Sequence, residues 1–313
     1  MKLINFETIK NANIPYNDYY NWMLELMKIK NKTILPPKIS MKTDGHKFYN
    51  IMPSIITDAG VAGVKVVTRY PMNTPTLSAD ILLYDYKTSK PLGLFDGTYI
   101  TMMRTGAIAA LSINTLAKKD YKNIAIVGLG NTARTTLLML IASNPNKHFN
   151  IKLRKYKNHA QLFIERFKNY DISFEIIEND KDFYENSDVI LSCVTFAESN
   201  LCKDEWFSDG CLVVPVHTMG FQNCDLFFDK EVVDDIGHVN TFKYFDKFKN
   251  CVELSDILNN KISGRDNDHQ KIIAYNIGLS IEDIYTAYKI LNKLDTLKIL
   301  EFENNIPKEK FWV

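Results

Sequence analysis

Cysteine is scarce in this chain of 313 residues, and none of its five cysteines belongs to a Cys-x-x-Cys pair. So few and so scattered thiols argue against a disulfide framework and against a zinc-binding motif. We therefore expect reduced, mostly buried thiols, as in a cytoplasmic protein, and no metal site. The cysteines are Cys193, Cys202, Cys211, Cys224 and Cys251.

Long hydrophobic runs are also missing. No apolar stretch approaches the roughly 20 residues that a membrane-spanning helix needs. The N-terminus, Met1 to Phe6, lacks the apolar segment of a signal peptide. The sequence thus predicts a cytoplasmic protein without a membrane partner.

Neither sign of charge is in excess, because 38 Lys and Arg residues face 37 Asp and Glu residues, for a net charge of +1. Without a basic stripe, no nucleic-acid partner is expected. The chain does have apolar residues in quantity, at 46%. That content and the length suit one large or two ordinary domains with a substantial core.

Short apolar runs alternate with helical patterns through the middle of the chain. Ile124-Ala125-Ile126-Val127 is wholly apolar, as expected of a parallel strand that is covered on both faces. Such alternation predicts an α/β fold with a Rossmann-type doubly wound sheet. Strands are expected at 124–127, 151–153, 189–191 and 212–216, and helices at 137–142 and 160–168.

The two ends of the chain have a different pattern. Helical spacing of apolar residues covers 17–30, and Thr101 is a candidate cap for a helix that reaches Ala117. Ile277, Ile281, Ile284 and Tyr288 predict a last helical face, which we expect to pack on a discontinuous N-terminal α+β domain. Further strands are expected at 65–67, 81–85 and 92–95, with a loop between the first two and a hairpin turn at 85–91.

The most informative loop is Gly128-Leu129-Gly130-Asn131-Thr132-Ala133, which follows an expected strand and opens an expected helix. In G-x-G-x-x-G/A, the first glycine makes a tight turn and the second admits a pyrophosphate. The small last residue lets helix and strand pack closely. The pattern indicates dinucleotide binding through Gly128, Gly130, Asn131, Thr132 and Ala133; a tight structural turn is the alternative.

Arg154 and Lys155 end the next strand, where an NAD-specific site would carry an acidic residue for the ribose hydroxyl. Two cations there would attract the 2′-phosphate of NADP(H). We therefore favour NADP(H) over NAD(H) as the cofactor, the alternative being two solvated charges at a strand end.

Several motifs together resemble the ornithine cyclodeaminase/mu-crystallin family over nearly the whole chain. The most specific, Ile100-Thr101-Met102-Met103-Arg104-Thr105-Gly106-Ala107, is similar to the family's L-T-x-x-R-T-G/A-A. Gly63-Val64-Lys65-Val66-Val67 with Pro71-Met72-Asn73 is similar to G-x-K-x-V…P-x-N. Leu83 to Leu92 resembles L-x-D-x-x-T-G-x-P-L, and Gly264-Arg265 and Asn276-Ile277-Gly278 resemble the C-terminal motifs.

The resemblance implies a homodimer that acts on small α-amino or α-imino acids. It also implies a substrate-binding and dimerisation domain of residues 1–112 with 277–313. A Rossmann domain would span residues 113–276.

The resemblance assigns roles to individual residues as well. Arg104 offers a bidentate fork to a substrate carboxylate, and Lys65 binds that carboxylate or acts beside the reacting carbon. Thr76 offers a hydroxyl, and Lys38 stands where the family often has arginine. Ile277 and Gly278 are further candidates for the substrate site. On the cofactor side the candidates are Thr105, Val194, Thr195, His217 and Met219.

One departure from the family pattern bears on the reaction. The aspartate that cyclodeaminases use as acid and base falls on Met219, which cannot transfer a proton. The family's reductase branch likewise lacks that aspartate and prefers NADPH. His217, two residues earlier at a strand's carboxyl end, is the candidate replacement acid, because histidine titrates near neutrality. The alternative for His217 is a hydrogen bond to backbone or cofactor.

The leading interpretation is therefore an NAD(P)H-dependent reductase of a small imino or ketimino acid. An amino-acid dehydrogenase, or a condensing amino-acid oxidoreductase, is the second interpretation. Ornithine cyclodeaminase, a lyase with catalytic NAD, is the third. A non-catalytic NADPH-binding protein represents a different class.

Overall fold

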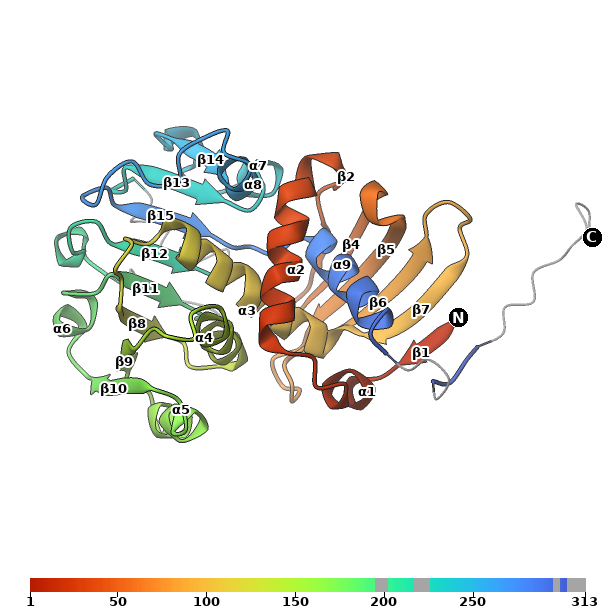
Figure 1. Ribbon diagram of the computed structural model, residues 1–313, viewed down its shortest axis with the longest axis horizontal. Coiled ribbons are helices and arrows are strands. Elements are labelled where there is room, and N and C mark those ends of the chain that lie inside the picture. The colour runs from red at the N-terminus through yellow and green to blue at the C-terminus, as the bar shows by residue number, and fades with distance from the viewer. Residues whose placement is uncertain (195–201, 217–225, 295–298, 303–313) are drawn as a thin grey trace, which may run out of the picture. The chain divides into compact units, whose positions relative to one another are not determined.

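The computed structural model describes residues 1–194, 202–216, 226–294 and 299–302 of the chain. The protein forms two compact units (Figure 1). The first unit comprises residues 1–14, 32–101 and 283–313, and the second comprises residues 15–31 and 102–282. Two of the boundaries between them fall inside the helices α3 (Gly97–Leu116) and α9 (Ser280–Leu291).

The first unit is built on a seven-stranded mixed sheet in the order β1-β7-β6-β5-β4-β2, with β3 paired to β4. Only β1 and β7 are parallel; the other pairs are antiparallel. The strands are β1 (Lys2–Ile4), β2 (Thr33–Ile34), β3 (Ile39–Lys42), β4 (Phe48–Ile56), β5 (Val61–Arg69), β6 (Leu77–Asp85) and β7 (Pro91–Asp96). The expected hairpin at 85–91 is confirmed, since Thr88 N–H donates to Asp85 Oδ1 at 2.8 Å.

The residues of α9 in this unit pack on strand β5. An added Cβ at Gly63 would lie 2.5 Å from Ile284 Cδ1 and 2.7 Å from the carbonyl oxygen of Leu82. Glycine at this position therefore lets the helix approach the sheet closely. Because strand residues alternate between faces, Lys65 lies on the same face as Gly63.

The second unit carries an eight-stranded parallel sheet in the order β10-β9-β8-β11-β12-β15-β13-β14. The strand order reverses between β8 and β11. Doubly wound sheets bind ligands at such a switch point, beside the carboxyl ends of the two strands. The expected Rossmann-type sheet is confirmed. Its strands are β8 (Asn123–Val127), β9 (Phe149–Arg154), β10 (Ile172–Ile177), β11 (Val189–Ser192), β12 (Leu212–Pro215), β13 (Lys230–Val233), β14 (Cys251–Glu253) and β15 (Ile272–Tyr275).

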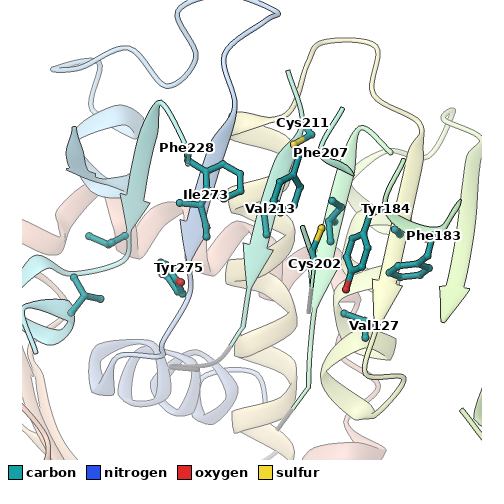
Figure 2. Close-up of a cluster of buried hydrophobic side chains, with 14 residues drawn as sticks. Val127, Phe183, Tyr184, Cys202, Phe207, Cys211, Val213, Phe228, Ile273 and Tyr275 are labelled. Atoms are coloured by element: carbon teal, nitrogen blue, oxygen red, sulfur yellow. The ribbon is translucent and has the colours of Figure 1, made fainter. Parts of the chain in front are cut away.

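The core beneath this sheet is aromatic. Figure 2 shows buried side chains along the strands, among them Tyr275, Phe228 and Phe207. Phe207 and Phe228 lie edge to face at 5.1 Å between ring centroids, a favourable aromatic geometry. This core holds the strands together and thereby fixes the positions at which the loops leave their carboxyl ends.

Helix α3 begins earlier than expected, so the proposed cap at Thr101 was wrong. The first turn is capped by Asp96, whose Oδ1 accepts from Thr98 N–H at 2.8 Å. The Thr101 hydroxyl instead donates to the Gly97 carbonyl at 2.6 Å, inside the helix. The remaining helices are α1 (Phe6–Asn11), α2 (Tyr16–Ile29), α4 (Asn131–Ser143), α5 (His159–Phe167), α6 (Asp180–Tyr184), α7 (Ile236–Val239) and α8 (Leu254–Leu258).

Residues 15–31 group with the second unit, whereas the sequence placed them in a domain of residues 1–112 with 277–313. Lys30, at the end of α2, is 7% exposed and lies 2.7 Å from both Asp235 and Glu253. These partners lie more than 200 positions away in the sequence, so local patterns gave no sign of the grouping.

Candidate active site

The loop after β8 has the backbone of a dinucleotide-binding turn. Gly128 has φ +82°, and an added Cβ would lie 2.4 Å from the carbonyl carbon of Cys193. The loop after β11 therefore approaches Gly128 too closely for any side chain. That approach also places Val194, another predicted cofactor residue, beside the loop, since its nitrogen would lie 2.6 Å from the same Cβ.

Gly130 is different, because it borders open space. It is the N-cap of α4, and an added Cβ would meet no atom within 4 Å among the described residues. Asn131 begins the helix, Thr132 is half-buried, and Ala133 is fully buried where helix and strand pack. The first-turn N–H groups and the positive end of the helix dipole thus border a space that suits a pyrophosphate. The residues present fit a dinucleotide.

This contrast between the two glycines yields a prediction. Gly128→Ala should unfold at lower temperature without any cofactor, because its Cβ collides with backbone. Gly130→Ala should keep the wild-type melting temperature but bind NADH at least about tenfold more weakly, because its Cβ fills the space for the pyrophosphate. Thermal unfolding with and without NADH tests both, and equal behaviour of the two variants would contradict the assignment.

Arg154 and Lys155 lie at the carboxyl end of β9, as predicted, and both have acidic partners. Arg154 donates to the carbonyls of Ile177 and Glu178, and its Nη2 lies 2.7 Å from Asp180 Oδ1. Lys155 pairs with the Glu178 carboxylate. The two cations therefore stand beside two carboxylates that would compete with a 2′-phosphate.

Arg104, on α3, is a buried cation of the second unit. Its side chain is 6% exposed, and its Nη1 lies 2.7 Å from Oε2 of the fully buried Glu282. Gly278 packs on the guanidinium, since an added Cβ there would lie 2.5 Å from Nη1. The structure thus brings together two predicted substrate residues, Arg104 and Gly278, and adds Glu282, which the sequence analysis missed.

The turn that contains Gly278 rests on Asp234, which follows β13. Asp234 Oδ2 accepts from the N–H groups of Ile277 and Gly278 at 2.8 and 2.9 Å. Complete burial raises the pKa of Asp234 to about 6, although those two N–H donors favour the ionised form. Asp234 was also missed; the available signal was its position directly after a Val-Val pair, at a strand's carboxyl end.

That raised pKa has a consequence for stability. A carboxyl group whose pKa is higher in the folded state stabilises the fold below its unfolded pKa, and this contribution is lost as the pH rises. Between about pH 4 and pH 7, wild type should lose on the order of 3 kcal/mol relative to Asp234→Asn, which does not titrate. Urea unfolding at several pH values measures the difference; a constant difference would contradict the prediction.

Asp188→Asn is the matched control for this experiment. Although Asp188 is partly buried, the N–H groups of Asn123 and Lys122 and the ammonium of Lys118 lower its pKa. Its stabilising contribution is therefore present above the ordinary carboxyl pKa and is lost as the pH falls. The two variants should show opposite pH trends.

Lys65 is a buried cation of the first unit. It is 1% exposed, and its Nζ lies 2.9 Å from Oδ1 of Asp283, which is fully buried. Glu282 and Asp283, the partners of Arg104 and Lys65, are consecutive residues of α9. The available sequence signal for both was a pair of adjacent acidic residues on a helix whose spacing of Ile281, Ile284 and Tyr288 predicts a packed face.

The other predicted residues are placed as follows. Lys38 is half-buried in the segment before β3, and Thr76 is exposed before β6, where its carbonyl accepts from Tyr70 N–H at 2.8 Å. Thr105 is half-buried on α3, and Ile277 is half-buried between β15 and α9. Thr195, His217 and Met219 lie outside the described residues.

Cys193 does not have the environment of a nucleophilic cysteine, because burial raises the pKa of its thiol far above the ordinary value. In the part of the chain that the structure describes, no three His, Cys, Asp or Glu side chains are grouped to hold a metal ion. Within that same part, no helix combines the length and apolar character needed to cross a membrane.

Comparison with known proteins adds to this geometry. The model of the ornithine cyclodeaminase/mu-crystallin family matches residues 18–297. The Delta(1)-pyrroline-2-carboxylate reductase of Bacillus thuringiensis subsp. konkukian is 26% identical over 265 residues, which are 78% of this chain and 80% of that protein. The N-((2S)-2-amino-2-carboxyethyl)-L-glutamate dehydrogenase of Staphylococcus aureus is 26% identical over 232 residues, 70% and 68% of the two chains.

Among solved structures, the chain is similar to the Thermococcus litoralis Delta(1)-pyrroline-2-carboxylate reductase in complex with NADH and L-proline. The TM-score is 0.83 at 26% identity, and the match covers 94% of this chain and 97% of that chain.

Proposed function

The chain belongs to the ornithine cyclodeaminase/mu-crystallin family, and from this membership we propose that it is an NAD(P)H-dependent reductase of a small imino or ketimino acid. The observation that carries the proposal is the buried Arg104 in the same unit as the Gly128–Gly130 loop. The Arg104 guanidinium can bind a substrate carboxylate, and the Gly128–Gly130 loop can bind a dinucleotide. The relatives that reduce pyrroline-2-carboxylate point to a cyclic imino acid.

The residues divide the chemistry as follows. A bound nicotinamide supplies the hydrogen and the electron pair that reduce the imine carbon. Arg104 binds the substrate carboxylate, and its ion pair with Glu282 holds the guanidinium in place before substrate arrives. Lys65, whose ammonium pairs with Asp283, is proposed to bind a substrate carboxylate or to hydrogen-bond beside the reacting carbon.

The proton donor is proposed from the sequence alone. A protonated imine is the better electrophile, and His217 follows the strand that ends at the switch-point edge of the sheet. We expect His217→Asn to lower turnover of the imine by at least about tenfold. Full turnover by this variant would contradict the role.

We further propose that NADP(H) is preferred, through Arg154. Arg154→Asp should weaken NADPH binding about 10- to 100-fold and change NADH binding little, because a charge-assisted contact with the 2′-phosphate is lost. Lys168→Asp, the same charge reversal at the end of α5, is the control and should change neither affinity. An unchanged ratio of NADPH affinity to NADH affinity in Arg154→Asp would contradict the proposed role of Arg154.

A second candidate function has support from one relative. The Staphylococcus aureus protein is named as a dehydrogenase of a secondary amino acid. The same residues would then act on the C–N bond in the oxidative direction, or on an imine formed by condensation of two substrates. Assays with amino acids and NAD(P)+ separate this candidate from the imine reductase.

We propose a homodimer in the cytoplasm, with residues 1–112 and 277–313 in substrate binding and dimerisation and residues 113–276 in cofactor binding. Sedimentation equilibrium should give twice the mass of the 36.1 kDa chain. A monomer at micromolar concentration would contradict the dimer.

The first experiment combines purified protein with NADPH or NADH and a panel of cyclic and open-chain imino acids. The loss of nicotinamide absorbance reports turnover. Turnover of an imine supports the reductase. Ammonia release from ornithine with NAD would instead establish the cyclodeaminase, and tight NADPH binding without any turnover would favour a binding protein.

A further inference from the structure

The turn between β15 and α9 forms one side of the Arg104 guanidinium. Gly278 has φ +84°, and an added Cβ would lie 2.5 Å from Nη1, 3.0 Å from Nη2 and 3.2 Å from Cζ of Arg104. The backbone of Gly278 is therefore in direct contact with the cation. Any shift of this turn must change the space in which the guanidinium lies.

Asp234 holds this turn from a neighbouring strand. Strands β13 and β15 are parallel, with Val233 opposite Tyr275, so Asp234 leaves the sheet beside the start of the turn. Its Oδ2 accepts from the N–H groups of Ile277 and Gly278, while its Oδ1 accepts from Asp235 N–H at 3.0 Å. Asp234 is 0% exposed.

The next N–H group of the turn connects it to the partner of Arg104. Leu279 N–H donates to Glu282 Oε2 at 3.3 Å, and the same oxygen accepts from Arg104 Nη1 at 2.7 Å. Three successive N–H groups, from Ile277 to Leu279, thus bind two buried carboxylates. Asp234 fixes the turn, and Glu282 binds both the turn and Arg104.

A purely structural carboxylate could cap a turn anywhere on the protein. Asp188 has such a structural role at the start of β8, where it accepts from the N–H groups of Lys122 and Asn123 at 3.1 and 3.0 Å. Asp234 differs from Asp188 because its Oδ2 accepts from the N–H group of Gly278, the residue that packs on Arg104. Full burial of a carboxylate is costly, so its presence here indicates a requirement for this turn geometry.

We propose that Asp234 is a positioning residue that sets the orientation of Arg104 through the turn at Ile277 and Gly278, and thereby the recognition of the substrate carboxylate. The inference rests on the proposed function, in which Arg104 binds that carboxylate. Asp234 itself does not touch the substrate.

Asp234→Asn tests the proposal, because asparagine keeps one oxygen acceptor but offers an N–H group where Oδ1 now accepts. We expect the KM for the imino acid to rise about tenfold, kcat to change less than about threefold, and NADH affinity to stay within about twofold. Intact NADH binding shows that the variant is folded. Asp188→Asn should keep the wild-type KM.

A double-mutant cycle with Arg104→Lys separates positioning from general stability. If Asp234 acts through Arg104, adding Asp234→Asn to Arg104→Lys should raise KM by less than about twofold further. Gly278→Ala, which pushes directly on the guanidinium, should reproduce the KM effect of Asp234→Asn if the latter fails to fold.

The outcomes are distinct. Coupled KM effects support the positioning role. Additive effects, or a normal KM in both Asp234→Asn and Gly278→Ala, overturn it while leaving the reductase intact. A wild-type enzyme that turns over no imine, or an Arg104→Lys variant with normal KM, overturns the proposed role of Arg104 and the inference with it.

Discussion

Replacing Arg104 with glutamine should lower kcat/KM for the imino-acid substrate by about 100- to 1000-fold. A bidentate, charge-assisted contact to a carboxylate contributes about 3–4 kcal/mol, and glutamine supplies neither the charge nor the fork. Because Arg104 would bind the ground state and the transition state alike, much of the loss should be in KM. Steady-state kinetics over a range of substrate concentrations measures the division.

Glutamine also leaves Glu282, which is 0% exposed, without its cation. The variant should therefore be less stable, and activity must be compared at a temperature where both proteins are folded. Arg104→Lys is the control, since it keeps a charge beside Glu282 and should show an intermediate KM with smaller loss of stability. Wild-type KM in Arg104→Gln would contradict carboxylate binding at this residue.

The largest effect on stability is expected from Lys65→Met. Lys65 and Asp283 are 1% and 0% exposed, so removal of the cation deprives the buried Asp283 carboxylate of this ion pair inside the first unit. The free energy of unfolding should fall by about 3–5 kcal/mol. Catalysis should fall by at least about 100-fold in the protein that remains folded. Chemical denaturation and imine turnover measure the two effects separately.

A repaired variant distinguishes the two roles of Lys65. Lys65→Met combined with Asp283→Leu replaces the buried ion pair by apolar side chains and should recover much of the stability without recovering activity. Lys230→Met is the control for loss of a buried lysine. Lys230 pairs with Asp266 at the start of β13, at the opposite edge of the sheet from the carboxyl ends of its strands, and its loss should leave turnover unchanged. An active Lys65→Met variant would contradict the proposed role.

Local patterns predicted the parts of the site that depend on backbone shape. Gly128 was identified because a strand, two glycines and a helix follow one another in sequence, and the structure shows the φ of +82° that makes this glycine necessary. The strands at 124–127 and 189–191 were identifiable because both faces are covered, so each is continuously apolar.

Strand β13 was not predicted, because two of its four residues are charged. Strand β13 begins with Lys230 and Glu231, which are 2% and 0% exposed and read as surface residues in isolation. Their burial is compensated because Asp266 pairs with Lys230 and because two N–H groups, those of Lys249 and Asn250, donate to Glu231. Those partners lie 18 to 36 positions away.

The sequence alone thus determined the fold class and the dinucleotide loop, because each depends on short-range periodicity or on residues within one motif, and its resemblance to the family identified two candidate cations. Only the tertiary structure decided what those cations bind. Lys65 and Asp283 are 218 positions apart, and Arg104 and Glu282 are 178 positions apart. A buried charge needs a partner, but which partner it receives is set by how strands and helices pack, and no local pattern contains that information.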